Sequence, residues 1–356
     1  MTVGCPKQMR YGPCGGVGGD GRCEVGGEQC VFVDAPAVAY PLADDTTFAD
    51  SAIASRPTVD GIATAAGREL LAIADTRPVV VTGIPAAPLS SASLKACADA
   101  LGGWADAAIS GDSGRARVQF PPSYRAALLA DFGMRGVMGL NCRDRNRVAL
   151  EGELIALADA NAAAVLCLTG DHTDLGDRAD AAPVFDLEGT QLARLARHLG
   201  LVSVVAESPF APPRSQRAVR VRAKAAAGAQ AVILQHVGDV ARLADFVAEV
   251  VELAPEVKVV AGIPLVVDPD GAAVLAAFTA AELPGGYVRA VLDAADPRAA
   301  GIAAAVEFAT SVLSIPGVSG VAVTGGARVG EEVDYCRALA ATARELGGGQ
   351  AVSGAP

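Results

Sequence analysis

The sequence is poor in aromatic side chains and in histidine, and it lacks a long apolar run. Aromatic residues make up 4% of the 356 residues, and there are only 3 histidines. Few aromatics argue against an aromatic-rich β-sandwich, whereas the abundant alanine, valine and glycine favour helices packed tightly on a parallel sheet. No segment is apolar for long enough to span a membrane, and the first residues lack the apolar stretch of a signal peptide. We therefore expect a cytoplasmic protein.

Acidic residues outnumber basic ones, which gives a formal net charge of −11. This excess argues against nucleic acid as a partner, although a local cluster of Arg and Lys still allows an anionic ligand. A complete Gly-x-Gly-x-x-Gly sequence between a strand and a helix is also missing, so a nicotinamide cofactor would have to bind in another kind of site. The histidines are not spaced as metal ligands, and we expect His172 and His236 to be loop or supporting groups.

Short apolar segments alternate with alanine-rich helical segments along most of the chain. This alternation predicts an α/β fold, a (β/α)8 TIM barrel. The expected strands are 78–83, 105–110, 136–141, 165–169, 202–206, 231–235, 257–263 and 318–323. The expected helices are 91–101, 147–161, 189–198, 216–227, 240–253, 272–281 and 299–313. The spacing is irregular around 118–122, next to the second strand.

The chain divides into four expected parts. They are a cysteine-rich zinc-binding module (1–40), a linker with a covering helix (41–76), the barrel (77–347) and a flexible tail (348–356). The linker prediction rests on the polar, Asp-rich sequence of 41–56. The helix prediction rests on the helical periodicity of 59–74, which we expect to cover the bottom of the barrel. The apolar segment 31–38 is expected to pack the module down.

Four cysteines lie among glycines near the N-terminus: Cys5, Cys14, Cys23 and Cys30. A segment this short buries too little surface to fold by itself, so it needs a crosslink such as a metal ion or disulfides. In a cytosolic chain four thiolates indicate a metal more often than disulfides, and glycine-rich turns let the backbone wrap around an ion. We predict a structural Zn²⁺ in a tetrahedral four-cysteine site. An iron–sulfur cluster and unrelated cysteines in a flexible tail are the alternatives.

The fourth expected strand ends in Thr169-Gly170-Asp171, and a polar loop follows. Active sites of α/β barrels are assembled at the carboxyl ends of their strands. Asp171 is therefore either a functional carboxylate or a cap of the next helix, and its position alone does not decide between the two.

The segments around this strand end resemble methylenetetrahydrofolate reductases. The resemblance extends from Arg77 to Gly347 and is carried by 139–147, 169–171, 175–177, 183–187, 224–229 and 234–235. It implies a folate-binding barrel that reduces 5,10-methylenetetrahydrofolate to 5-methyltetrahydrofolate with NADH or NADPH, a step of one-carbon metabolism that serves methionine biosynthesis. The cysteine segment resembles a small domain found with some of these reductases. There it follows the barrel or lies on a companion chain, whereas here it comes first.

The resemblance also implies which residues bind the ligands. Asp171 and Gln235 match the folate contacts of the relatives, and a carboxylate with a carboxamide can hold the donor–acceptor edge of a pterin. The alternative for Gln235 is a bridge between strands. Thr82 and Asn141, at other strand ends, complete the expected substrate contacts. The expected cofactor contacts are Gly170, Lys224, Arg143 and Arg145. The two arginines suit a nucleotide phosphate or the glutamate tail of folate, or they form a solvated face.

Reductases of this family normally hold a flavin, and four of the supporting positions differ here. Thr82 stands where the relatives have a glutamate that assists proton delivery, Gly139 replaces a histidine, Glu207 a tyrosine and Arg217 an aspartate. These differences argue against bound FAD. Without a flavin, hydride would pass directly from the nicotinamide to the folate, with both ligands stacked in the barrel mouth.

The missing acid needs a replacement, because threonine is no general acid near neutral pH. Glu207 would serve if burial raised its pKa, and Asp171 is the other catalytic candidate. Otherwise Glu207 pairs with Arg143, Arg145 or Lys224.

Two other functions compete with the reductase. One is a non-catalytic folate-binding partner that keeps Asp171 and Gln235 but has lost the acid. The other is a methyl-transfer component that uses the cysteine site, which fits less well because four cysteines close the ligand shell of a metal. The oligomeric state and the choice between NADH and NADPH are encoded in no motif.

Overall fold

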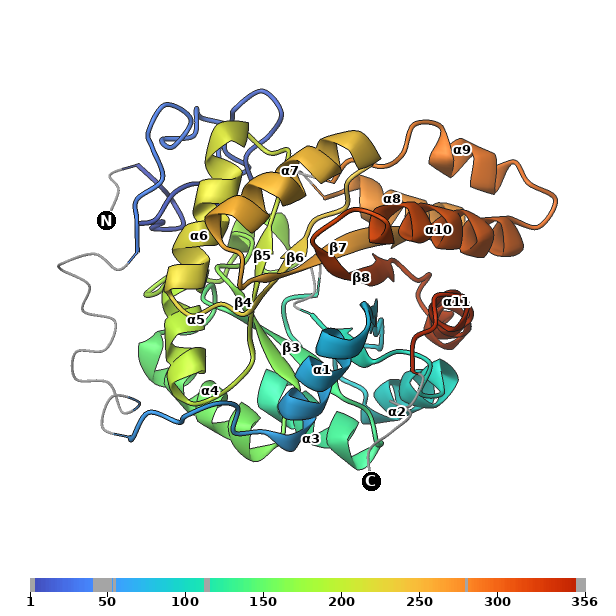
Figure 1. Cartoon of the computed structure of the whole chain (residues 1–356), viewed down its shortest axis with the longest axis horizontal. Coiled ribbons are helices and arrows are strands. Elements are labelled where there is room, and N and C mark those ends of the chain that lie inside the picture. The colour runs from blue at the N-terminus through green and yellow to red at the C-terminus, as the bar shows by residue number, and fades with distance from the viewer. Residues whose placement is uncertain (1–3, 41–52, 54–55, 112–115, 279–280, 350–356) are drawn as a thin grey trace.

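The protein is described by a computed structural model covering residues 4–40, 53, 56–111, 116–278 and 281–349. Its centre is a closed barrel of parallel strands in sequence order, in which β8 pairs with β1 (Figure 1). The strands are β1 (Val79–Gly83), β2 (Ala107–Ser110), β3 (Gly136–Asn141), β4 (Ala164–Leu168), β5 (Ser203–Glu207), β6 (Ala231–Leu234), β7 (Lys258–Leu265) and β8 (Val318–Gly325). The predicted (β/α)8 barrel is confirmed.

Helices surround the barrel. They are α1 (Ala65–Thr76), α2 (Ser91–Leu101), α3 (Pro122–Asp131), α4 (Arg147–Asp159), α5 (Gly189–His198), α6 (Arg217–Ala226), α7 (Val240–Leu253), α8 (Pro269–Ala276), α9 (Tyr287–Leu292), α10 (Pro297–Leu313) and α11 (Glu332–Glu345). Short 3-10 turns lie at Thr173–Leu175 and Arg214–Gln216. No helix among the described residues is long and apolar enough to cross a membrane.

Several predicted boundaries need correction. Helix α8 begins before the predicted 272–281, because the Asp268 side chain accepts from Gly271 N and Pro269 fits the first helical position. Residues 279 and 280 lie outside the described part of the chain, as do most of the predicted linker 41–56 and of the predicted tail 348–356. Helices α3, α9 and α11 were not predicted.

Alternation along the strands separates the inside of the barrel from the layer between strands and helices. In β1, Val79 and Val81 belong to the inner apolar cluster, whereas Val80 belongs to the outer one. The other strands repeat the pattern, because successive side chains of a strand point to opposite faces. This alternation decides which strand-end residues can face a ligand in the barrel mouth.

Helix α1 closes the amino-terminal end of the barrel, as predicted for the covering helix. Leu70 and Ile73 of α1 join the inner cluster with Val79 and Val81. The helix begins only at Ala65, later than the predicted 59–74, because the Thr64 side chain caps it by accepting from Gly67 N. The opposite end of the barrel is thereby left as the open mouth.

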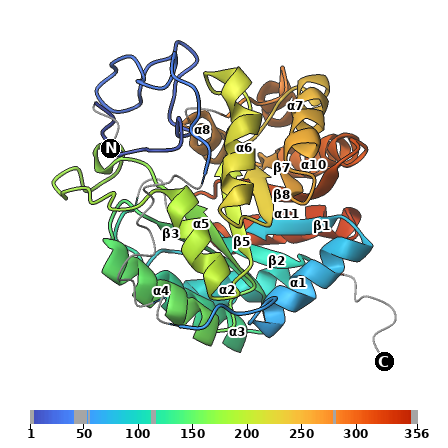
Figure 2. The same cartoon turned by 60° about the vertical axis from the view of Figure 1, so that its left-hand side comes forward.

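The cysteine module, residues 4–40, lies beside α6 in both views of the molecule (Figures 1 and 2). It contains no helix and no strand longer than the isolated bridges Val17–Cys23 and Arg22–Gln29. Gly12 shows how closely it packs, because a methyl group added there would lie 2.7 Å from Cδ of Arg220 in α6. The module is therefore seated directly on the barrel.

Candidate active site at the barrel mouth

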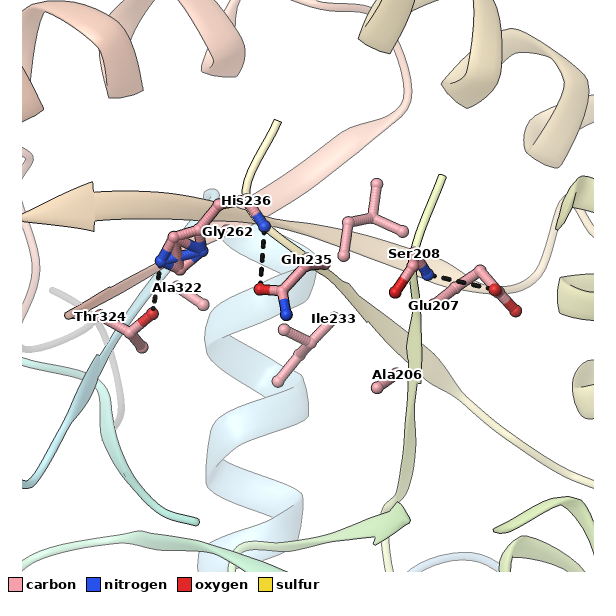
Figure 3. A pocket seen from close by; sticks show the side chains of 10 residues that line it. Ala206, Glu207, Ser208, Ile233, Gln235, His236, Gly262, Ala322 and Thr324 are labelled. Atoms are coloured by element: carbon pink, nitrogen blue, oxygen red, sulfur yellow. Dashed lines mark hydrogen bonds between the residues drawn. The ribbon is translucent and has the colours of Figure 1, made fainter. Parts of the chain in front are cut away.

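A cavity of about 130 Å³ opens at the carboxyl ends of β5 to β8. Small or apolar inward-facing residues form its floor, and uncharged polar residues form its rim (Figure 3). The floor residues are Ala206, Ile233, Gly262 and Ala322, and the rim residues are Ser208, Gln235, His236 and Thr324. A pocket with an apolar floor and a few polar groups is typical of a site for a planar organic ligand.

The side chain of Gln235 is fixed by one local hydrogen bond through its oxygen, and its NH₂ group lies along the cavity. Its Oε1 accepts a hydrogen bond from the backbone N–H of His236 at 3.1 Å, and its own N–H donates to Glu207 O at 2.9 Å. No side chain or carbonyl among the described residues pairs with its Nε2. The carboxamide N–H₂ group is thus available to an acceptor on a ligand.

His236 lies in the same rim and is 5% exposed. Its Nε2 is 3.2 Å from Oγ1 of Thr324 on β8, while Nδ1 has no hydrogen-bond partner within the described part of the chain. Burial lowers the pKa of His236 to about 4, so the ring is neutral near pH 7. Sequence reasoning treated His236 as a supporting group, whereas the structure makes it part of the cavity wall.

The β3–β4 side of the mouth carries Asn141 and Asp171. Asn141 is buried, and its Oδ1 accepts from Asp144 N at 3.2 Å. Asp171 is exposed just beyond β4, and no hydrogen bond joins it to Gln235 among the described residues. Gly170 has a φ of +92°, and a methyl group there would lie 3.1 Å from Cβ of Asn141. It therefore serves the tight turn that leads to Asp171.

Thr82 does not face the mouth, which corrects its prediction as a substrate contact. It follows Val80 on the outer side of β1, where it is fully buried. Its Oγ1 has no hydrogen-bond partner within the described ranges. The strand-end position was identified correctly, but the direction of the side chain was not.

Glu207 also faces outward, between β5 and α6, and Figure 3 shows its side chain directed away from Gln235. Its carboxylate lies 3.0 Å from Nη1 of Arg217 and 2.7 Å from Nζ of Lys224. Burial would raise the pKa of Glu207, but the charges of Lys224, Arg217 and Arg220 outweigh burial and lower the pKa to about 2. The role of Glu207 as an acid required a raised pKa, and the structure contradicts this. The alternative, a pairing of Glu207 with Lys224, is confirmed.

The expected cofactor contacts are dispersed. Lys224 is held in the layer between β5 and α6, where it also donates to Ala206 O at 2.6 Å. Arg143 is fully buried and binds both carboxylate oxygens of Asp144 at 2.7 Å. Arg145 is half-buried and has no ion pair among the described residues. Of these cations, Arg145 is the one best placed to meet an anionic ligand.

The four cysteines of the module carry free thiols. Burial, and to a smaller extent the charges of neighbouring cysteines, raise the pKa of Cys5 and of Cys30. The backbone N–H of Val25 also donates to Sγ of Cys23 at 3.5 Å, an interaction that favours a thiolate. This donor set fits Zn²⁺, although no group of three or more His, Cys, Asp or Glu among the described residues is arranged around an ion. The metal site stays a prediction.

One functional residue that the sequence analysis missed is Glu188. It is 1% exposed, and its Oε2 accepts from the backbone N–H groups of Arg10 and Tyr11 in the module, at 2.6 and 3.3 Å. Its pairing with Gln191 as a capping box at the start of α5 was the available signal. The capping motif predicts where the helix starts, but not that the Glu188 carboxylate also binds backbone amides of the cysteine module.

Comparison with solved structures identifies the fold. An uncharacterized protein from Clostridium thermocellum that binds two copies of 5-methyl-5,6,7,8-tetrahydrofolic acid has a TM-score of 0.54 and 10% identity, over 78% of this chain and 99% of that one. A 2,3-dimethylmalate lyase has a TM-score of 0.49 and 11% identity, over 77% and 85%. Tryptophan synthase from M. tuberculosis has a TM-score of 0.48 and 14% identity, over 80% and 98%. At 10% identity, the likeness to the Clostridium thermocellum protein shows a shared fold alone.

Comparison with protein families is more specific. No curated protein matches this chain. The family described as "Methylene-tetrahydrofolate reductase C terminal" matches residues 1–47, at the opposite end from the one its description gives. The family described as "Methylenetetrahydrofolate reductase" matches residues 111–324, which is more than half of the chain. The chain therefore belongs to the methylenetetrahydrofolate reductase family.

Proposed function

We propose that this protein reduces 5,10-methylenetetrahydrofolate to 5-methyltetrahydrofolate with NADH or NADPH, in the cytoplasm and in the service of methionine biosynthesis. The observation that carries the proposal is the cavity at the mouth of a barrel of this family, with an apolar floor and a polar rim where no acceptor among the described residues pairs with Nε2 of Gln235. An amide donor at the rim of the cavity that has no protein acceptor favours a ligand that supplies one.

The pterin is proposed to bind between Gln235 and Asp171. Gln235 would donate to a ring nitrogen or carbonyl of the pterin, and the Asp171 carboxylate would accept from its amine and amide N–H groups. Asn141 is buried at the end of β3 and lies close to Gly170, the residue before Asp171, so it would shape that end of the site. Arg145 remains the proposed contact for the glutamate tail or a nucleotide phosphate.

We infer that Glu207 and Arg217 do not serve a flavin in this protein. Glu207 and Arg217 are fully engaged with each other, and Nη1 of Arg217 also donates to Cys14 O of the module at 3.0 Å. The charged groups at these two positions are thus turned toward each other and toward the module, and neither is presented to the mouth as a flavin contact. We therefore derive no step through FAD.

The reaction is proposed to be a single hydride transfer. The nicotinamide would supply hydride to the folate methylene carbon as its bond to the second folate nitrogen opens, and that nitrogen takes up a proton. The protein would stack the two rings over the cavity floor and exclude water. Since Glu207 is ionised and turned outward, Asp171 is the proposed route for the proton, directly or through water.

The zinc ion is proposed to be structural. Cys5, Cys14, Cys23 and Cys30 would hold it, and four thiolates leave no open coordination position for chemistry. The ion would order the module that the barrel then binds.

A non-catalytic folate-binding protein is the second candidate. It is favoured because Glu207, the carboxylate among the residues that line the cavity, is directed away from it and paired with Arg217 and Lys224. Purified protein separates the candidates. NADH oxidation that depends on methylenetetrahydrofolate, with deuterium passing from 4-deuterated NADH into the product methyl group and no flavin absorbance, would support the reductase. Folate binding without turnover would leave the second candidate. A yellow protein with stoichiometric FAD would overturn direct transfer.

A further inference from the structure

The hydrogen bonds between the cysteine module and the barrel, among the described residues, involve the segments that follow β4 and β5 and the first turn of α6. Nε2 of Gln8 donates to Val184 O at 3.3 Å, and the N–H of Ala37 donates to Oε1 of Gln216 at 2.9 Å. Glu188 accepts from two module amides, as described above. All of these barrel residues lie in the chain that follows β4 or β5. The module is thus hydrogen-bonded at the functional end of the barrel, while Tyr11 and Tyr40 pack against Ala223 and Ala227 along α6.

Arg217 is the centre of this attachment. Its side chain is fully buried and contacts both the cysteine module and the barrel. Nη1 donates to Cys14 O at 3.0 Å in the module and to the Glu207 carboxylate at 3.0 Å. Nε donates to Ala211 O at 2.8 Å, and Nη2 donates to Pro212 O, both in the loop after β5. One guanidinium therefore ties the cysteine loop, the end of β5 and the following loop together.

The same loop touches the cavity directly. A methyl group added at Gly15 would lie 2.8 Å from Oγ of Ser208, which lines the cavity. Gly15 and Cys14 are adjacent, so the bond from Arg217 to Cys14 O also sets how closely Gly15 approaches Ser208.

We propose that the cysteine module is a fixed wall of the ligand site, and that Arg217 is the positioning residue that holds this wall against Ser208. The inference rests on the proposed function and deepens it. The wall bounds the mouth beside Ser208, at the end of β5, and so limits the space in which the folate and the nicotinamide can stack. Arg217 touches neither ligand and acts through residues 14, 15 and 208.

The first test compares Arg217→Lys with Arg135→Lys. A lysine at 217 keeps the charge beside Glu207 but cannot reach all the acceptors of the guanidinium, whereas Arg135 pairs with Glu69 on an exposed surface. We expect Arg217→Lys to raise amide hydrogen exchange across residues 8–16 by about 10-fold or more, and to raise the KM for folate by about 10-fold with kcat within about 2-fold. Arg135→Lys should change neither. Unchanged exchange and unchanged KM, or a fall in kcat alone, would overturn the proposal.

The second test leaves Arg217 in place, so it remains decisive if Arg217→Lys fails to fold. Gly15→Ala should raise the folate Kd, because the new methyl group strikes Oγ of Ser208. Ser208→Ala removes that oxygen, so the double variant should bind folate at least about 5-fold better than the two single effects predict. Additive effects would contradict the proposed wall. Hydrogen exchange and 5-methyltetrahydrofolate binding need no turnover, so a wild-type protein without reductase activity would overturn the proposed function alone.

Discussion

Arg217 and Glu207 form a buried ion pair, with 3.0 Å between Nη1 of the arginine and Oε1 of the glutamate. Neither side chain is more than 2% exposed. Lys224 binds the second carboxylate oxygen at 2.7 Å, so one negative charge is shared by two cations. Removing one member of such a group leaves an uncompensated charge away from water, which costs far more than the pairing itself gains. The pair therefore matters for the stability of the β5–α6 layer rather than for proton transfer.

Glu207→Gln is expected to destabilise the protein by roughly 3–5 kcal/mol, because Arg217 and Lys224 lose their shared counter-charge. Urea unfolding followed by circular dichroism measures the change. Glu69→Gln is the matched control, since Glu69 pairs with Arg135 at 58% side-chain exposure and should cost less than about 1 kcal/mol. Equal effects of the two substitutions would show that the buried network carries no special stability.

The same substitution should change the pH dependence of unfolding. The folded-state pKa of Glu207 is about 2, below its ordinary value of 4.5. The ionised carboxylate therefore contributes its full stability above about pH 4.5, and the contribution is lost as the pH falls toward 2. Wild-type stability should fall more steeply than that of Glu207→Gln over this window. Parallel curves would contradict the lowered pKa.

Asp171→Asn and Gln235→Ala should each weaken binding of 5-methyltetrahydrofolate by roughly 1–3 kcal/mol, the usual cost of removing one partner of a buried hydrogen bond. Titration calorimetry measures the affinity. Asp180→Asn is a suitable control, because Asp180 lies in the same loop but pairs with Arg178 on the surface. If both site variants bind folate as tightly as the wild type, the pocket lies elsewhere.

Sequence reasoning recovered the barrel because strands and helices alternate with a regular apolar pattern. It placed β3, α2, α5 and α7 at the bounds seen in the structure, where capping residues or turn glycines punctuate the chain. It missed α11, which ends next to a glycine-rich segment. It began the α1 helix too early, at residue 59, because the segment before Ala65 instead bonds to the chain after α5, as in the hydrogen bond from Ala63 N to Gly200 O. Tertiary hydrogen bonds of this kind leave no local signal.

The site was predictable only in part. Gln235 faces the cavity as expected, because inward and outward positions alternate and its strand end was placed correctly. Thr82 and Glu207 were assigned to the mouth although both point outward, and a shift of one residue at a strand end reverses the direction of a side chain. The docking of the module on Glu188 and Arg217 joins residues far apart in sequence, so no motif could have revealed it.

Zinc should copurify with the protein at about one ion per chain, since four thiolates complete a tetrahedral shell. Elemental analysis of protein prepared without chelator measures the content. Cys14→Ser should release the ion and expose residues 4–40 to proteolysis, whereas Cys97→Ser, a buried cysteine of α2, should retain it. Metal-free wild-type protein would rule out the site, and iron with visible absorbance would indicate a cluster instead.

His236 should stay neutral over the physiological range. Burial lowers its pKa from 6.5 to about 4, so its ring resonance should not shift between pH 5.5 and 8 in an NMR titration. Loss of one resonance in His236→Gln assigns the signal among the three histidines. The unfolded chain binds this proton more readily than the folded one, so His236 should reduce stability progressively as the pH falls from about 6.5 to 4. Titration near pH 6.5 would show that the ring is solvated.

Gly262→Ala should close the proposed site. A methyl group at Gly262 would lie 2.5 Å from Leu234 O and 3.0 Å from Nδ1 of His236, so β6 or the imidazole would have to move into the cavity. We expect folate affinity to fall by 10-fold or more, with a loss of stability of roughly 1–3 kcal/mol from overpacking. Gly83→Ala is the matched control at the end of β1, because its methyl group would meet Thr324 Cγ2 at an ordinary 3.6 Å. Calorimetric titration of both variants with 5-methyltetrahydrofolate decides the matter, since full affinity in Gly262→Ala would mean that the ligand does not use the β6–β7 side of the mouth.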